Sequence, residues 1–251
     1  KDVLSPPNHK AFSNVAELVV FIEDIATATG LPVGIKAAIG KLEQWNELAD
    51  IMKTTGKGPD FITVDGGEGG TGAAPPSFAD HVSLPWVYAF GDLYKLFLKK
   101  NLTERIVFIG SGKLGFPGKA AMAFAMGVDC INVAREAMMS IGCIQSQVCH
   151  TNKCPSGVAT QSKWLQNGID PTLKSVRLAQ YFKTFRKEFV EITHAAGYEH
   201  PCQFKMRDIE INVDDHNLSK KMNRTYNYSK TPVPFNTMQE LKDCIYLGGK
   251  Q

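Results

Sequence analysis

Apolar positions in the first 135 residues alternate between helical spacing and short continuous runs. Residues 14–29 place apolar side chains three and four positions apart, which predicts a helix that ends at Gly30. The apolar run that follows predicts a strand, and this pairing recurs along the chain. The predicted helices are residues 14–29, 41–55, 86–100 and 117–126, and the predicted strands are residues 32–38, 61–64, 105–109 and 130–134.

Four successive strand and helix units predict a parallel sheet covered by helices, because each crossover must carry the chain back over the sheet. The strands end in polar or glycine-rich residues, namely Lys36, residues 65–67, residues 110–112 and residues 135–136. Open α/β sheets and βα barrels both place their sites at the carboxyl ends of their strands. A glycine there can simply turn the chain, but three such loops in succession favour a binding site.

The remaining residues follow a different pattern. Residues 136–162 contain a cluster of cysteines, and residues 174–196 have the spacing of an amphipathic helix. Residues 197–251 lack sustained periodicity, and we expect them to form an arm on the surface. We therefore divide one domain into residues 1–135, the cysteine loop at 136–162, and the helix and arm at 163–251.

Composition narrows the class of protein. The 251 residues are 43% hydrophobic, which is enough for a sizeable core, and 28 Lys and Arg against 25 Asp and Glu give a net charge of only +3. No basic run suggests nucleic acid, and the longest apolar stretch, residues 120–133, is too short and too polar for a membrane span. Residues 1–7 lack the apolar region of a secretory signal, so we expect a cytoplasmic protein whose six cysteines are thiols or metal ligands.

Three cysteines, Cys143, Cys149 and Cys154, lie within twelve residues, with Pro155 directly after the last. Thiolates hold iron–sulfur clusters and zinc, and a loop with three of them can wrap one inorganic core. No fourth cysteine is near, since Cys130 lies in a predicted buried strand, which favours a three-iron cluster. A zinc site that adds His150 is the rival, although neighbouring side chains rarely face one metal. Uncoordinated cysteines are the third alternative.

Two glycine-rich loops and one lysine are the other candidates. Residues 65–75 include five glycines, so backbone N–H groups there can approach an anion or a planar ring closely. Residues 109–118 lead into the helix that begins near Pro117, whose amino end can hold a phosphate. Together the loops favour a mononucleotide over ATP, since the P-loop ending is missing. Lys36 in an apolar strand needs an anion or hydrogen-bond partners, unless it extends to solvent as a strand-end charge.

Taken together, these motifs resemble the FMN-binding synthase domain of glutamate synthase and its stand-alone relatives. The resemblance extends from Ser5-Pro6-Pro7 to about residue 200. It is carried by Gly34-Ile35-Lys36, Gly69-Gly70-Thr71-Gly72-Ala73-Ala74-Pro75, Ser83-Leu84-Pro85-Trp86, the loop at 110–118, and Cys143 with Cys149-His150-Thr151-Asn152, Cys154-Pro155 and Gly157-Val158-Ala159-Thr160-Gln161.

That resemblance implies a βα barrel with FMN at its C-terminal mouth and a [3Fe-4S] cluster. The implied oxidoreductase acts on CH–NH₂ donors: reduced flavin gives hydride to 2-iminoglutarate, formed from 2-oxoglutarate and ammonia, and L-glutamate results. Ferredoxin or an NAD(P)H-dependent flavoprotein would supply the electrons. By position, Lys36 would lie near flavin and substrate, Gly69, Gly70, Thr71 and Gly72 would border them, Gly110, Ser111, Gly112, Ala134 and Arg135 would hold the FMN phosphate, and Cys143, Cys149 and Cys154 would bind iron.

This sequence also departs from the family pattern. The lysine strand typically continues Leu-Val-Ser-Glu, whereas Ala37-Ala38-Ile39-Gly40 follows here, so another keto or imino acid is an alternative substrate. No N-terminal cysteine nucleophile of a glutaminase domain can be assigned. A non-catalytic module with a zinc-stapled loop is a further alternative.

The number of strands predicts half a barrel. Only four strands are predicted, and the Ser5-Pro6-Pro7 segment normally follows the fourth strand of eight. We therefore expect an α/β fold that is the C-terminal half, about four βα units, of a TIM-type (βα)₈ barrel. Such a half exposes two strand edges, so we expect it to pair with an N-terminal half-barrel or with a second copy of itself.

Overall fold

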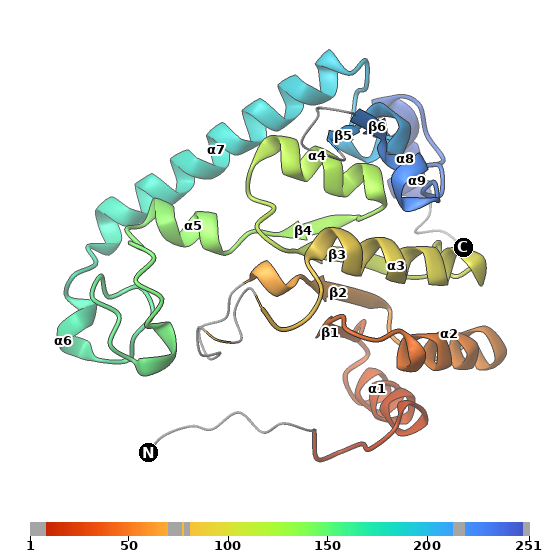
Figure 1. The fold of residues 1–251 in the computed structure, drawn as a ribbon, viewed down its shortest axis with the longest axis horizontal. Helices are drawn as coiled ribbons and strands as arrows, with labels where there is room; N and C mark the ends of the chain where they lie inside the picture. The colour runs from red at the N-terminus through yellow and green to blue at the C-terminus, as the bar shows by residue number, and fades with distance from the viewer. Residues whose placement is uncertain (1–8, 70–76, 78–80, 213–218, 248–251) are drawn as a thin grey trace.

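A computed structural model describes residues 9–69, 77, 81–212 and 219–247 (Figure 1). The first part of the chain alternates helices with strands. Its elements are α1 (Val15–Thr29), β1 (Gly34–Ala38), α2 (Glu43–Thr55), β2 (Phe61–Asp65), the 3-10 turn η1 (Gly67–Gly69), α3 (Trp86–Lys99), β3 (Val107–Ser111), α4 (Pro117–Met126) and β4 (Cys130–Asn132).

The second part of the chain is mostly helical. Its elements are α5 (Arg135–Ser140), η2 (Cys149–Thr151), α6 (Lys163–Gln166), α7 (Pro171–Ala195), η3 (Pro201–Gln203), η4 (Met206–Asp208), β5 (Glu210–Asn212), β6 (Ser219–Lys221), α8 (Met222–Tyr226) and α9 (Met238–Leu247). Strands β5 and β6 form a small antiparallel pair. No helix of the described residues is long and apolar enough to cross a membrane.

The four main strands form one parallel sheet in the order β1-β2-β3-β4. Because each strand lies beside its predecessor and crossovers are right-handed, α2, α3 and α4 fall on the same face of the sheet. Figure 1 shows these helices along the outer side of the strands. A doubly wound sheet would instead reverse its strand order and carry helices on both faces. The fold is therefore α/β, as predicted, and is consistent with part of a TIM-type barrel.

The main core lies between the sheet and α3. Strands β2 and β3 direct Ile62, Val64 and Phe108 outward, and each is at most 1% exposed. The apolar positions of α3 recur at helical spacing, so Phe90 and Phe97 pack against these strands and are fully buried. Burial of each such side chain stabilises the fold by about 1.5–3 kcal/mol. This outer layer fixes the strand ends where the candidate site lies.

Two strands differ from their predicted bounds. Strand β3 begins two residues later, because the Arg105 guanidinium turns back to bind the carbonyl oxygens of Met52 and Gly56 at the end of α2. Strand β4 is shorter than predicted, and Cys130 is exposed rather than buried. Cys130 lies on the inner face of the last strand in the sheet, where no described element covers it, so the expectation that its strand was buried is wrong.

The C-terminal arm contributes to the core, although its sequence has no sustained periodicity. Met206 and Met222 are at most 1% exposed, and both join the cluster beneath α3. The Tyr228 hydroxyl donates a hydrogen bond of 3.1 Å to the carbonyl oxygen of Met126 at the end of α4. The arm is therefore fastened to the amino-end side of the sheet, because α4 ends where it turns into β4.

Helix α7 begins three residues earlier than predicted, because the Asp170 carboxylate accepts a 3.0 Å hydrogen bond from the Thr172 N–H and caps it. Its inner side packs on α4 through Phe189, which is 8% exposed. Some of the apolar positions that predicted an amphipathic helix lie outside this contact. Val176, Phe182 and Ile192 are exposed.

Candidate active site at the strand ends

An ion pair joins the first two strands at their carboxyl ends. The Lys36 Nζ lies 2.5 Å from the Asp65 Oδ2. The register aligns Ala38 with Asp65, so both charged side chains stand on the inner face of the sheet. The Lys36 side chain is 61% exposed and the Asp65 side chain 21%, so the lysine is not desolvated. The sequence predicted Lys36 as singular but missed Asp65 as its partner, because only the register reveals that pairing.

Backbone hydrogen bonds join the loops after the strands into one rim. The Gly66 N–H donates to the Ser111 carbonyl oxygen at 2.8 Å, and the Gly67 N–H donates to that of Leu84 at 2.9 Å. The Leu84 N–H in turn donates to the carbonyl oxygen of Ile39 at 3.0 Å. The ends of β1, β2 and β3 are therefore held together by the segment that leads into α3.

The Glu68 carboxylate caps α3. Its two oxygens accept the Trp86 N–H at 2.9 and 3.0 Å. A negative charge at a helix amino end is favourable, since the N–H groups there have no partner within the helix. Glu68 thus ties the glycine-rich loop after β2 to the same helix.

Trp86 explains why two candidate phosphate-loop positions are glycine. Its indole is fully buried. A Cβ added at Gly112 would lie 2.5 Å from the Trp86 Cβ, and one added at Gly110 would lie 2.8 Å from the Trp86 Cζ2. These glycines therefore allow the tryptophan to pack beneath the rim. The buried Trp86 Nε1 and Ser83 Oγ have no hydrogen-bond partner among the described residues.

The structure brings most of the predicted strand-end residues to one edge of the sheet. Gly110 and Ser111 end β3, Gly112 follows it, and Ala134 and Arg135 stand where α5 begins, just after β4. The register places Ala38, Asp65, Ser111 and Asn132 in one row across all four strands. Gly69 ends η1, whereas the predicted residues Gly70, Thr71 and Gly72 lie outside the described residues.

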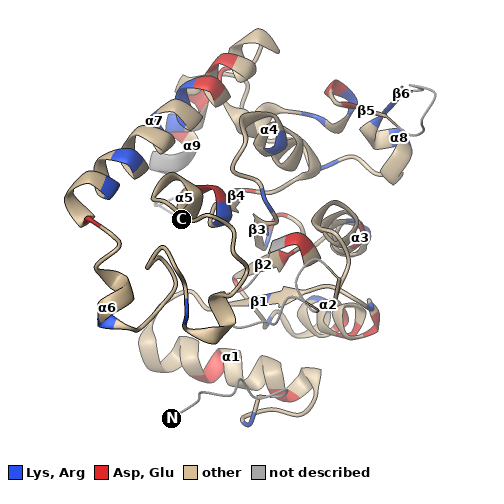
Figure 2. Ribbon diagram, turned by 60° about the vertical axis from the view of Figure 1, so that its left-hand side comes forward, with Lys and Arg blue, Asp and Glu red and all other residues tan. Residues whose placement is uncertain are grey.

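The cysteine loop follows α5 and is closed by its own polar side chains. Asn152 has a left-handed backbone, with φ of 62°, and its side-chain oxygen accepts the Gln161 N–H at 2.6 Å. The Thr160 hydroxyl donates to the Asn152 carbonyl oxygen at 2.7 Å. Residues that flank the cysteines in the motif thus form a clasp: hydrogen bonds join Asn152 to Thr160 and Gln161 and close the segment between them. Figures 1 and 2 show the segment between α5 and α6 on the same side of the sheet as the strand ends.

Cys154 lies in a cradle of hydrogen-bond donors. Its side chain is 5% exposed, and its Sγ lies 3.5 Å from the Ser156 Oγ. Burial acts to raise the pKa of the Cys154 thiol, but hydrogen bonds from the Ser156 hydroxyl and from the backbone N–H groups of Ala159, Ser156 and Val158 outweigh burial and lower the pKa. Donors aimed at a sulfur stabilise the thiolate, which is the form that binds metal.

The other two candidate ligands are less enclosed. Cys143 and Cys149 are partly exposed thiols, and the Gln145 N–H donates to the Cys143 Sγ at 3.4 Å. Within the described ranges, no three His, Cys, Asp or Glu side chains lie together in a group that could hold a metal ion. The donor set therefore fits an iron–sulfur cluster in chemistry, while the loop must draw its sulfurs closer to bind one. His150 does not complete a metal-binding group with them either.

Comparison with known proteins gives one consistent family. The family model described as "Conserved region in glutamate synthase" matches residues 1–199. The chain is 40% identical over 215 residues to the glutamate synthase large subunit-like protein YerD of Bacillus subtilis, which covers 86% of this chain and 41% of YerD.

Two further relatives match most of this chain but only a smaller part of their own length. The chain is 30% identical over 224 residues to the ferredoxin-dependent glutamate synthase of Cyanidium caldarium, covering 88% of this chain and 14% of that protein. It is 29% identical over 196 residues to the archaeal glutamate synthase [NADPH] of Methanocaldococcus jannaschii, covering 78% and 38%. The chain thus spans less than half the length of each of these relatives. With most of its residues inside the conserved region, this chain belongs to the glutamate synthase family.

Proposed function

We propose that this chain forms part of the synthase site of a glutamate synthase-type oxidoreductase. The reaction is the two-electron reduction of 2-iminoglutarate, formed from 2-oxoglutarate and ammonia, to L-glutamate. A hydride adds to the imine carbon and a proton to its nitrogen, so the C=N bond becomes a C–N single bond. The observation that carries the proposal is Cys154, a thiol inside a cradle of donors, in a loop on the same side of the sheet as Lys36.

Lys36 is the residue that we propose to bind the substrate carboxylate. Its ammonium group is exposed on the inner face of the sheet, so it can contact a small acid without any change in the backbone of β1. Asp65 holds that ammonium at the strand end, and a substrate carboxylate would share it or displace Asp65. A lysine suits this task because its compact charge turns freely toward either oxygen atom.

The rim residues are proposed to hold FMN, and the cysteine loop is proposed to hold the [3Fe-4S] cluster. FMN would supply the hydride and the cluster would relay single electrons to it. Ser111 and Arg135 would bind the phosphate, since a hydroxyl and a guanidinium at the ends of neighbouring strands suit an anion. Cys143, Cys149 and Cys154 would bind the iron, and Gly69, Gly70, Thr71 and Gly72 would border the flavin ring.

Electron donors and a completing half-barrel are further parts of the proposal. Relatives are named as ferredoxin-dependent or as [NADPH] enzymes, so a donor of either class is expected here. The inner face of β1 and β4 exposes Lys36, Ala38, Cys130 and Asn132, and a groove of about 410 Å³ lies between α1 and β1. Additional strands from the rest of the protein or from a second copy would cover these edges.

A different keto or imino acid is the second candidate substrate. In the family pattern the lysine strand continues Leu-Val-Ser-Glu, whereas Ala37-Ala38-Ile39-Gly40 follows Lys36 here, so Gly40 stands where the acidic residue would be. Asp65 is the carboxylate that contacts Lys36 instead. Because the carboxylate beside Lys36 comes from β2 and not from the residues after β1, the site can accept different substrate groups beside the lysine.

The test is anaerobic purification of the full-length protein, with iron, acid-labile sulfide, zinc and FMN quantified. The proposal expects about three iron atoms and one FMN per chain, and flavin that, after reduction with dithionite, is reoxidised when 2-oxoglutarate and ammonia are added together. Reoxidation of the flavin by another keto acid with ammonia, but not by 2-oxoglutarate with ammonia, would support the second substrate class. A colourless protein with one zinc and no flavin would overturn both redox proposals in favour of the zinc-stapled module.

A further inference from the structure

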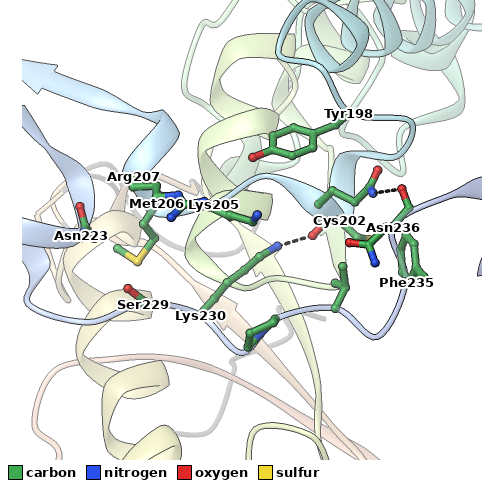
Figure 3. Close-up of a pocket in the computed structure, with 13 residues that line it drawn as sticks. Tyr198, Cys202, Lys205, Met206, Arg207, Asn223, Ser229, Lys230, Phe235 and Asn236 are labelled. Carbon is green, nitrogen blue, oxygen red and sulfur yellow. Dashed lines mark hydrogen bonds between the residues drawn. The ribbon is translucent and has the colours of Figure 1, made fainter.

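The C-terminal arm encloses a second pocket, far from the strand ends. The pocket has a volume of about 470 Å³ and lies between η3, η4 and residues 229–236 (Figure 3). We call it the arm pocket. Lys230 in its wall binds the carbonyl oxygen of Phe124 in α4, just before α4 ends and leads into the amino end of β4. The arm pocket therefore lies near the amino ends of the strands, whereas Lys36 lies near their carboxyl ends.

Positive charge gathers in this pocket. Its lining residues include Lys205, Arg207 and Lys230, and none of its described lining residues is Asp or Glu. Figure 3 shows Lys205 and Lys230 extending their ammonium groups toward the same space. The nearby Asp208 carboxylate is already engaged, since it accepts the Tyr198 hydroxyl at 2.7 Å and the Lys205 N–H at 2.8 Å. No carboxylate of the described residues forms an ion pair with these three cations.

Lys230 is only partly satisfied by the protein. Its Nζ donates to the carbonyl oxygens of Phe124, at 3.0 Å, and Cys202. An ammonium group has three donors, so one remains for the pocket. Burial is the largest cause, and together with the Lys205 charge it lowers the pKa of Lys230 to about 8, against the opposing effects of Cys202, Asp129 and Asp208. A charge held in this setting is stabilised when an anion enters beside it.

Asn223 contributes a hydrogen-bond acceptor that lacks a donor, whereas Lys230 contributes a donor that lacks an acceptor. Asn223 is one of the lining residues, and its side-chain oxygen is buried and has no hydrogen-bond partner among the described residues. A buried acceptor without a partner is costly, so a turn of the Asn223 amide toward a ligand that brings a hydroxyl or N–H donor would be favourable. Phe235, Val233 and Pro232 supply apolar surface for the rest of such a molecule.

The wall of the pocket is held in place independently of any ligand. The Gln203 side-chain amide donates to the Asn236 carbonyl oxygen at 2.7 Å, and the Met238 N–H donates to the Glu199 carboxylate at 2.5 Å. These bonds join Asn236 and Met238 to Gln203 in η3 and to Glu199 just before it, across more than 30 residues of chain. The pocket is therefore formed before a ligand arrives, which reduces the ordering cost of binding.

We propose that the arm pocket binds a small organic anion, with carboxylate or phosphate groups, that also carries a hydrogen-bond donor. Lys205, Arg207 and Lys230 would bind the anionic groups and Asn223 would accept the donor. Because the pocket lies near the amino ends of the strands and Lys36 lies at their carboxyl ends, this ligand would not compete with the substrate at Lys36. The inference goes beyond the proposed synthase function and does not depend on it.

Calorimetric titration of the full-length protein at low salt tests this site. The probes are citrate and ribose 5-phosphate, which carry hydroxyl donors, and tricarballylate, which is citrate without its hydroxyl. Saturable binding of citrate or ribose 5-phosphate is expected, with weaker binding of tricarballylate. Which of the two probes binds distinguishes a carboxylate ligand from a phosphate ligand.

Variants decide whether the binding occurs in the arm pocket. Lys205→Met and Arg207→Met should each weaken it about tenfold, since a charge-assisted hydrogen bond is lost. Both side chains are exposed, so we expect both variants to keep the fold. Lys183→Met, an exposed lysine on α7, is the matched control and should leave the affinity within about twofold. Absence of saturable binding by the wild type, or equal loss in Lys183→Met, would overturn the proposal.

Discussion

Lys36 and Asp65 form an ion pair across neighbouring parallel strands, with 2.5 Å between Nζ and Oδ2. Two strand-end residues 29 positions apart in the chain thus share the inner face of the sheet. An exposed pair of this kind contributes only about 0–1 kcal/mol to stability. Its position at the carboxyl ends of the strands, where barrels place their chemistry, supports the proposed role of this pair in binding.

Lys36→Ala should remove turnover while leaving the visible absorption of the proposed iron–sulfur cluster unchanged. The lysine is proposed to bind the substrate carboxylate, whereas the cysteines lie in a separate loop after β4. The measurement is steady-state reductive amination of the keto acid in the presence of ammonia, together with the absorbance spectrum. Lys41→Ala, an exposed lysine just beyond β1, is the control and should retain activity. Full turnover by Lys36→Ala would contradict this assignment.

The partner residue gives a graded version of the same prediction. Asp65→Asn removes the charge that competes with substrate for Lys36, so the KM for the keto acid should change while the free energy of unfolding falls by no more than about 1 kcal/mol. Urea denaturation measures the stability. A larger loss would mean that the pair supports the fold and not the site.

The cysteine loop predicts a distinct pattern of cluster loss. Cys143→Ser, Cys149→Ser and Cys154→Ser should each abolish cluster absorption and leave flavin binding largely intact, because a serine hydroxyl is a poor soft ligand. Cys244→Ser is the matched control, since Cys244 is an exposed thiol outside the loop. Iron and sulfide analysis of the anaerobically purified variants gives the readout. A cluster that survives Cys149→Ser would refute the ligand set.

Sequence patterns predicted the elements whose signals are local. Helix α4 matches its predicted bounds, and α1 ends before Gly30, which adopts the left-handed conformation with φ of 67°. Such periodicity and capping depend on residues within a few positions of each other. Lys36 and the cysteine motif were visible for the same reason.

What the sequence missed depends on distant contacts. The Asp65 partner of Lys36 follows from the parallel register, and the exposure of Cys130 follows from its place on the sheet's edge. Tyr228 packs on α4 from about 100 residues away, in a segment with no periodic pattern. Three-dimensional pairing decides each of these, and no local pattern encodes it.

The clasp of the cysteine loop predicts a graded effect at Asn152. Asn152→Ala loses the acceptor for the Gln161 N–H and strains a backbone with φ of 62°, whereas Asn152→Asp keeps an acceptor and tolerates that conformation. Exchange of the Gln161 amide hydrogen should accelerate in the alanine variant by about ten- to a hundredfold, equivalent to about 1.4–3 kcal/mol. Equal protection in both variants would show that the clasp is dispensable.

Packing of Trp86 beneath the rim predicts the cost of a single methyl group. Gly112→Ala would bring a Cβ within 2.5 Å of the tryptophan Cβ and should destabilise the fold by about 1–3 kcal/mol. Gly118→Ala is the control, because no atom lies within 4 Å of its added Cβ in α4 and alanine favours a helix. Urea unfolding of both variants measures the difference. Equal stability of the two variants would mean that the rim can yield around Trp86.

Lys230 predicts a pH dependence of stability that can be isolated by difference. Burial, as the largest cause, lowers its pKa in the folded protein from 10.5 to about 8, so between these values the unfolded chain binds more protons than the folded one. The free energy of unfolding therefore gains a contribution from this residue as pH rises above 8, with a slope of at most about 1.4 kcal/mol per pH unit. Cys202 and several tyrosines with raised pKa act in the opposite direction above pH 9. They are present in both wild type and Lys230→Met, but loss of the Lys230 charge also raises the pKa of Cys202, so the two proteins are compared below pH 9. Subtracting the variant's free energy of unfolding in urea from that of the wild type at each pH should leave a rise that begins near pH 8.

A flat difference would show that the lysine is hydrated in the folded state. A rise that shifts to higher pH in saturating citrate would show that an anion stabilises the charge of Lys230.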